Sequence, residues 1–304
     1  MTSILTNVAA MSALSTLRSI SSGMEETQSR VSSGERVGEA SDNAAYWSIA
    51  TTMKSDNMAL SAVSDALGLG ASKVDTAYAG MDAAIDVVKE IKAKLVTATE
   101  EGVDKAKVQE EISQLQEQLM SIAESAAFSG ENWIAGDAAD VTVVSGFVRD
   151  ANNAVSVKTT TYTLDDAADG TLLFGGDGAG GIDDTTGVLG TAGGATIGVS
   201  VYELDISTFD GTEMAEALTL VDEALASMTS AAAELGSIST RIELQEDFVG
   251  SLSDSLDSGI GRLVDADMNE ESTRLKALQT QQQLAIQSLS IANSSSEVIL
   301  SLFR

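Results

Sequence analysis

Two stretches of this chain place an apolar residue at every seventh position. One runs from residue 46 to 95 and the other from 214 to 263, and no polar residue interrupts either repeat. Such a sustained heptad repeat is typical of long helices packed lengthwise against a partner. Because the two stretches are equally long and flank a different middle region, we predict two antiparallel, coiled-coil-like helices. The repeat positions are Tyr46, Met53, Leu60, Leu67, Val74, Met81, Val88, Leu95, Met214, Val221, Met228, Leu235, Ile242, Val249, Leu256 and Leu263.

Helical spacing also marks residues 108–126 and both ends of the chain. In 108–126 the apolar residues follow at alternating steps of four and three, which predicts a third helix. The N-terminal segment has a looser apolar stripe, and the C-terminal segment has two adjacent stripes, one through Leu278 and one through Leu284. Two adjacent stripes make an apolar surface too wide for a single partner helix. We therefore predict a mainly α fold built from both chain ends, whose terminal helices expose more apolar surface than one molecule covers.

The middle region, residues 131–212, has a different pattern. It holds more than half of the 26 glycines and alternates with period two, as strands do. Asn152–Asn153 lies where a hairpin turn would join two such runs. We predict a small β-rich central insert, and a disordered acidic loop is the alternative. The residues expected to share strand faces are Val155, Val157, Thr159, Thr161 and Thr163 in one run, and Ile197, Val199 and Val201 in another.

Charge is distributed very unevenly along the chain. There are 46 acidic and 17 basic residues, and the formal net charge is -29. Residues 1–24 contain one charged side chain, Arg18, and residues 277–304 contain only Glu297 and Arg304. This distribution indicates buried ends and a solvated middle. Because so acidic a molecule repels nucleic acid and anionic lipid, we expect no nucleic-acid partner and no membrane insertion.

Few residue types are available for catalysis or metal binding. The absence of His and Cys removes the commonest general base, the thiolate nucleophile and the usual transition-metal ligands. The spacing Gly176-x-Gly178-x-x-Gly181 resembles a dinucleotide-binding loop, but the helical pattern that this motif requires does not follow it. It also resembles a calcium-binding nonapeptide, with Gly180 where that repeat needs Asp. We expect no enzyme activity, no cofactor and no dedicated metal site.

The N-terminus does not look like a cleaved secretion signal. Its first residues, Met1–Leu5, lack both the positive stretch and the continuous apolar core of such a signal. No apolar run approaches the roughly 18 residues of a membrane span. If the protein leaves the cell, we expect a route that cleaves no signal peptide.

Short motifs near both ends resemble those of bacterial flagellins. From Arg30 the chain reads Arg-Val-Ser-Ser-Gly-Glu-Arg, followed by Ser-Asp-Asn-Ala-Ala, which resembles the family's Arg-Leu-Ser-Ser-Gly-x-Arg before Asp-Asp-Ala-Ala. Arg262–Asp267 is similar to the family's Arg-Ile-x-Asp-Ala-Asp, and the last residues resemble its terminal Val-Leu-Ser-Leu. The positions that carry this signature are Arg30, Ser33, Gly34, Arg36, Asp42, Arg262, Asp265 and Asp267.

The resemblance implies a structural subunit that self-polymerises into the extracellular bacterial flagellar filament for swimming motility. It implies a terminal inner-tube domain from 1–34 and 265–304, a helical rod from 35–130 and 213–264, and a variable surface insert at 131–212. It also implies export by the flagellar secretion system, with an export chaperone, the filament cap, hook-associated proteins and other flagellins as partners. The residues expected at the polymerisation interface are Ile4, Val8, Met11, Leu14, Leu17, Leu278, Ala285, Leu289, Ala292, Ile299 and Phe303.

Two alternatives stay open from the sequence. A hook–filament junction protein would share the terminal helices but would cap the assembly instead of propagating it. A secreted calcium-binding or adhesive module would use the helices as a stalk. Self-polymerisation would distinguish the first alternative, and a calcium titration of the insert would distinguish the second.

Overall fold

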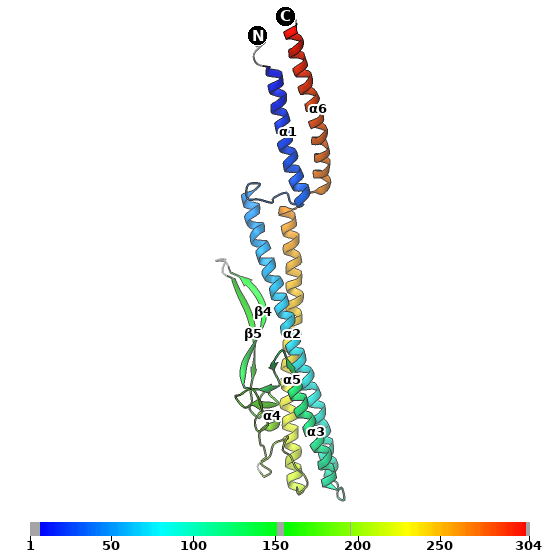
Figure 1. Cartoon of the computed structure of the whole chain (residues 1–304). Helices are drawn as coiled ribbons and strands as arrows, with labels where there is room; N and C mark the ends of the chain where they lie inside the picture. The colour runs from blue at the N-terminus through cyan, green and yellow to red at the C-terminus, as the bar shows by residue number, and fades with distance from the viewer. Residues whose placement is uncertain (1–6, 151–154, 195, 302–304) are drawn as a thin grey trace. The chain divides into compact units, whose positions relative to one another are not determined.

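The computed structural model describes residues 7–150, 155–194 and 196–301, and most of them are helical (Figure 1). The chain divides into two compact units, Met1–Met58 with Ser253–Arg304, and Ala59–Leu252. The predicted division into three regions stays a prediction. The helices are α1 (Val8–Ser33), α2 (Ala44–Ala98), α3 (Lys105–Ser125), α4 (Gly187–Gly190), α5 (Gly211–Val264) and α6 (Met268–Ser301). The strands are β1 (Ala127–Phe128), β2 (Glu131–Asn132), β3 (Ala135–Gly136), β4 (Ala139–Arg149), β5 (Val155–Leu164), β6 (Phe174–Gly176) and β7 (Ile182–Asp183).

In the first unit, α1 and α6 form an antiparallel pair. At one end of the pair, the Asn7 side-chain amide donates to the Ala292 carbonyl at 3.0 Å. At the other end, the Arg30 guanidinium donates to the Glu271 carboxylate at 3.4 Å. The same Asn7 side chain accepts from the Ala10 backbone N–H and so caps α1. The predicted terminal helices are therefore present, and within one copy of the chain they pack against each other.

The long heptad repeats form the seam between α2 and α5, as predicted. In the second unit, all twelve repeat residues from Leu60 to Leu95 and from Met214 to Val249 are between 0% and 3% exposed. The helices run antiparallel, because Asp75 contacts Ser239 and Lys92 contacts Asp222. In the first unit, Met53 and Leu263 pack on a small core of Ala50, Ile260 and Val264. Tyr46 is 43% exposed, so the repeat extends beyond the buried seam there.

Helix α3 folds back along α2 in the second unit, which confirms the third predicted helix. Ile112 and Leu119 are fully buried, and Lys94 of α2 pairs with Glu111 at 2.5 Å. Gly80 of α2 allows close approach, since a Cβ there would lie 2.7 Å from the Ala126 Cβ. The second unit therefore has a three-helix core.

The predicted β-rich insert is also present, and strand pairing begins at β1. The turn between β1 and β2 uses Ser129 and Gly130, both with positive φ, as a tight two-residue hairpin requires. The main hairpin pairs β4 with β5 antiparallel, with a bulge between Val144 and Gly146. The predicted turn residues Asn152–Asn153 lie outside the described residues. A small sheet completes the insert in the order β3-β6-β7.

The predicted strand through Ile197, Val199 and Val201 is wrong. Val199 makes a single isolated antiparallel bridge with Gly193, and the Val201 carbonyl instead accepts from the side chain of Gln116 at 3.1 Å. Because the buried Gln116 amide also donates to the Leu204 carbonyl, this segment is fixed to α3 by side chains instead of a strand ladder.

Candidate functional site

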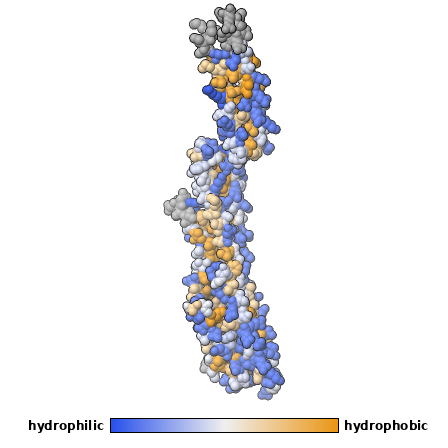
Figure 2. Space-filling view, viewed as in Figure 1, coloured by the Kyte–Doolittle hydropathy of each residue, from blue (hydrophilic) through white to orange (hydrophobic). Residues whose placement is uncertain are grey.

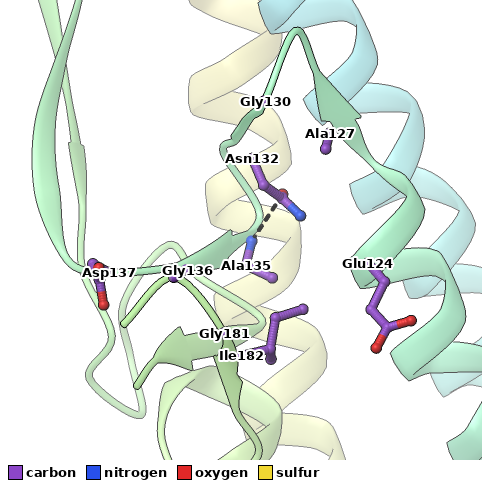
Figure 3. Close-up of a pocket in the computed structure, with 10 residues that line it drawn as sticks. Glu124, Ala127, Gly130, Asn132, Ala135, Gly136, Asp137, Gly181 and Ile182 are labelled. Atoms are coloured by element: carbon purple, nitrogen blue, oxygen red, sulfur yellow. Dashed lines mark hydrogen bonds between the residues drawn. The ribbon is translucent and has the colours of Figure 1, made fainter. Parts of the chain in front are cut away.

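A cavity of about 470 Å³ lies where the end of α3 meets the insert, bounded by Glu124, β1–β3 and the glycine-rich loop, residues 175–181 (Figure 3). Asn132 and Asp137, two polar residues of its lining, are engaged within the protein. The Asn132 amide donates to the Ala123 carbonyl at 2.6 Å and accepts from two backbone N–H groups, including that of Ala135. Across the described residues, no group of three or more His, Cys, Asp or Glu side chains could hold a metal ion. This cavity presents no arrangement for catalysis.

The glycine-rich loop uses its backbone donors internally. One Asp177 carboxylate oxygen accepts from the N–H groups of Ala179 and Gly181 at 2.7 and 2.8 Å, and these hydrogen bonds hold the pKa of Asp177 below its ordinary value. Asp137 accepts from the Gly178 N–H at 3.0 Å. The donors that a phosphate would need are thus occupied by carboxylates, and strand β7 follows instead of a helix. The loop is a turn whose backbone N–H groups are bound by Asp177 of the loop and by Asp137 of the insert.

The α1–α6 pair of the first unit carries exposed apolar surface (Figure 2). On α1, Val8 is 70% exposed and Met11 is 64% exposed, and Leu14 is also exposed. On α6, Ile291 is 68% exposed, and Leu284 and Ile286 are exposed as well. Large apolar side chains this exposed and this close in sequence mark an interaction surface.

The predicted interface residues separate into two groups. Val8, Met11 and Leu14 lie on the exposed surface of α1. The others that can be placed are half-buried on the stripes through which α1 and α6 meet: Leu17, Leu278, Ala285, Leu289 and Ala292. Ile4, Phe303 and the side chain of Ile299 lie outside the described residues.

Four exposed large apolar residues of α6 were absent from the predicted interface, namely Met268, Leu284, Ile286 and Ile291. The second apolar stripe of the C-terminal segment contains Leu284 and Ile291, so the sequence held a signal for two of them. Which stripe of α6 would face α1 depended on how the two helices pair, and the periodicity alone did not specify this pairing.

Across the described residues, no helix is both long and apolar enough to cross a bilayer.

Several signature residues form the connections between the helices of the first unit. Gly34 ends α1 with a φ of 76°, a conformation that favours glycine, and its carbonyl accepts from the Ala266 N–H. The Ser33 hydroxyl accepts from the Glu35 N–H, and Glu35 pairs with Asp265 as an antiparallel bridge.

The remaining signature residues act through caps and single hydrogen bonds. Arg36 donates to the Leu263 carbonyl, Asp42 accepts from the N–H groups of Gly38 and Glu39, and Asp267 caps the start of α6. Arg262 lies exposed in the last turn of α5. The signature residues therefore cap helix ends and hydrogen-bond the connections between the helices of this unit. These roles explain why these residue types occur at this spacing.

Comparison with known proteins agrees with this architecture. Residues 4–139 match the bacterial flagellin N-terminal helical region, and residues 218–303 match the bacterial flagellin C-terminal helical region. Flagellin A of Rhizobium meliloti (strain 1021) is 55% identical to this chain, flagellin C of that strain is 53% identical, and a flagellin of Brucella melitensis biotype 1 is 45% identical. Each alignment covers 100% of both proteins. The chain belongs to the bacterial flagellin family.

Proposed function

We propose that copies of this chain polymerise through the outward faces of α1 and α6. As a flagellin, the chain is a structural subunit of the extracellular flagellar filament that serves motility, and it is not an enzyme. The full-length similarity to flagellins favours this function over a hook–filament junction protein or a calcium-binding or adhesive module. The observation that carries the interface proposal is the exposure of Val8, Met11 and Ile291 on otherwise ordered helices.

Burial of these faces supplies the driving force in this proposal. Removing apolar surface from water contributes about 25 cal/mol per Å², so several such side chains at each end offset a substantial ordering cost. The near absence of charge in residues 1–24 and 277–304 means that few ions are desolvated when copies meet. A contact between two different surfaces that does not close into a ring generates an open helical fibre.

The proposal includes a role for each region of the chain. Residues 1–34 and 265–304 would form the inner tube, residues 35–130 and 213–264 the rod, and residues 131–212 the variable outer surface. The helix breaks after Ser33 and after Val264 support the first boundary. The two family matches leave residues 140–217 uncovered, which supports a more variable middle.

Export and further partners complete the proposal. The chain would pass through the flagellar secretion channel without a cleaved signal peptide, with a chaperone bound to its C-terminal segment. It would assemble beneath a cap protein, next to hook-associated proteins and alongside other flagellins. Support comes from membership of the bacterial flagellin family.

A pair of charged variants tests the interface. The double variant Val8→Glu, Ile291→Glu adds two charges on the exposed α1–α6 surface, where the monomer tolerates them. A control, Ser156→Glu with Thr159→Glu, adds the same charge to exposed positions of β5. Negative-stain electron microscopy should show filaments from the control and none from the α1–α6 variant, with equal helical content by circular dichroism. Normal filaments from the α1–α6 variant would refute the proposal.

A further inference from the structure

We infer that a pocket between the β4–β5 hairpin and α5 binds a small oxyanion, that is, a phosphate, sulfate or carboxylate group. The pocket lies within the second unit, where the hairpin runs along the long helices (Figure 1). Its volume of about 290 Å³ leaves room for such an anion together with several water molecules. Its polar lining includes Ser145 of β4, Thr160 of β5, and Arg241 and Gln245 of α5. The inference goes beyond the proposed function, because it concerns a ligand of the single subunit and not the assembly.

The polar side chains of this pocket are not engaged within the protein. None of these four side chains forms a hydrogen bond or an ion pair with another residue that the structure describes. In this respect the pocket differs from the cavity at the end of α3, where Asn132 and Asp137 are engaged. Hydroxyl, amide and guanidinium groups all donate hydrogen bonds, so one ligand with several acceptor oxygens can satisfy them together.

Arg241 is the charged group of the pocket, and it has no acidic neighbour on its own face of α5. None of the residues three or four positions away is acidic, and Glu234 lies two turns away, about 10 Å along the helix axis. At about 0.15 M salt, charges more than about 8 Å apart are largely screened, so the guanidinium attracts an anion although the chain carries a net charge of -29. A guanidinium binds a phosphate or a carboxylate through two parallel hydrogen bonds.

Lys158 of β5 brings a second positive charge to this side of the hairpin. It lies opposite Gly146 in the β4–β5 ladder, and residues opposite each other point to the same face of the hairpin. A Cβ at Gly146 would lie 3.2 Å from the Gln245 Nε2 atom, so this face is the one turned toward α5. Lys158 forms no ion pair with any residue in the described parts of the chain. An anion in the pocket would therefore have two cations available to it.

The β-bulge of β4 lies at the same pocket. Ser145 is the bulged residue, since it has no partner in the ladder between Val144 and Gly146. A bulge redirects a side chain and is often found next to a site. Gly146 follows directly, and a larger residue there would crowd the Gln245 amide. The bulge and the glycine thus keep a hydroxyl and an amide beside Arg241.

Titration of the full-length protein with two anions tests the inference. Sodium phosphate and sodium acetate are added at constant ionic strength, and binding is followed by the phosphorus NMR line width and by saturation transfer to the acetate methyl group. At least one anion should bind saturably with a Kd on the order of 1 mM, and the one that binds more tightly identifies the head group. Arg241→Gln, which removes the charge but keeps an amide, should weaken binding about tenfold or more. Arg262→Gln is the matched control, the same change at an exposed position of α5 outside the pocket, and should bind as the wild type does.

A second variant tests the hairpin wall of the pocket. Thr160→Val removes the hydroxyl but keeps a β-branched side chain that suits a strand, so binding should weaken about threefold with unchanged circular dichroism. The inference is overturned if neither anion binds saturably to the wild type, or if Arg241→Gln binds as tightly as the wild type. Neither result would affect the proposal for α1 and α6, which the Val8→Glu, Ile291→Glu variant tests separately.

Discussion

Arg30 of α1 and Glu271 of α6 form an ion pair across the two terminal helices, with 3.4 Å between Nη1 and Oε1. The Glu271 side chain is 9% exposed, and its second carboxylate oxygen has no hydrogen-bond partner among the described residues. Arg30 also pairs with Glu26 on its own helix at 2.5 Å. A buried carboxylate depends on its partner, so this pair aligns α1 with α6 at a defined register.

Replacing Arg30 by Met should destabilise the first unit. The change leaves the buried Glu271 carboxylate without its counter-ion, and the expected loss is about 2–4 kcal/mol. Urea unfolding followed by circular dichroism measures it. Adding Glu271→Met to the same chain should recover most of the loss, because the uncompensated charge is then removed. An unchanged unfolding midpoint for Arg30→Met would show that the pair does not fix the register.

Gly70→Ala should destabilise the second unit, although alanine is the better helix former. A Cβ at Gly70 would lie 2.3 Å from the Val143 Cγ1 atom of β4, so the hairpin must shift, at a cost of about 1–3 kcal/mol. Gly68→Ala is the matched control, since a Cβ there meets nothing within 4 Å. That control should gain about 0.5–1 kcal/mol in thermal unfolding. Equal gains from both variants would contradict the packing of β4 on α2.

Stability should fall at alkaline pH because of Tyr162. Burial raises the pKa of Tyr162 from its ordinary value of 10.0 to about 12; the nearby Thr171 hydroxyl lowers the pKa and the Glu234 charge raises it, both by less than burial does. Since the folded-state pKa lies above that of the unfolded chain, this contribution is fully present below about pH 10 and is lost between about pH 10 and 12.

The magnitude of that loss is on the order of 2–3 kcal/mol. Tyr162→Phe should abolish it, and it should not weaken the protein at pH 8, because the buried hydroxyl has no hydrogen-bond partner among the described residues. Urea unfolding at pH 8 and pH 11 measures both effects, and about half of the loss is present at pH 11. The exposed control Tyr78→Phe should keep the wild-type pH dependence. Identical alkaline losses in Tyr162→Phe and the wild type would rule out this assignment.

Removing residues 285–304 should leave a soluble, largely helical protein that does not polymerise. The truncation takes away Ile291 and the stripe that faces the start of α1, while the buried seam of the second unit is intact. Circular dichroism checks the helical content, and sedimentation with electron microscopy checks assembly. Filaments formed by this truncated protein would contradict the role of the chain ends.

The heptad repeats could be read from the sequence because burial in a long helical pair has a simple period. Leu67 and Leu235 lie where that period requires, fully buried between the helices. Tyr46 departs from it: periodicity specifies a face of a helix, whereas burial depends on whether another element covers that face. Nothing in the sequence indicated that Tyr46, at the start of α2, would lack a packing partner that buries it.

Non-local hydrogen bonding and helix pairing could not be read in the same way. The alternation through Val199 and Val201 matches a strand, but Gln116, more than eighty residues earlier, donates to the carbonyl groups of Val201 and Leu204. Similarly, both stripes of α6 are mainly apolar, and the contact with α1 distinguishes the half-buried Leu278 from the exposed Leu284. These outcomes depend on partners distant in sequence.

Electron cryomicroscopy of the assembled filament tests the central claim most directly. The account predicts that Val8, Met11 and Ile291 are buried against neighbouring copies, while Leu278 and Leu289 still pack against α1 of their own chain. A filament in which Val8, Met11 and Ile291 face solvent, with the copies joined through other surfaces, would contradict it.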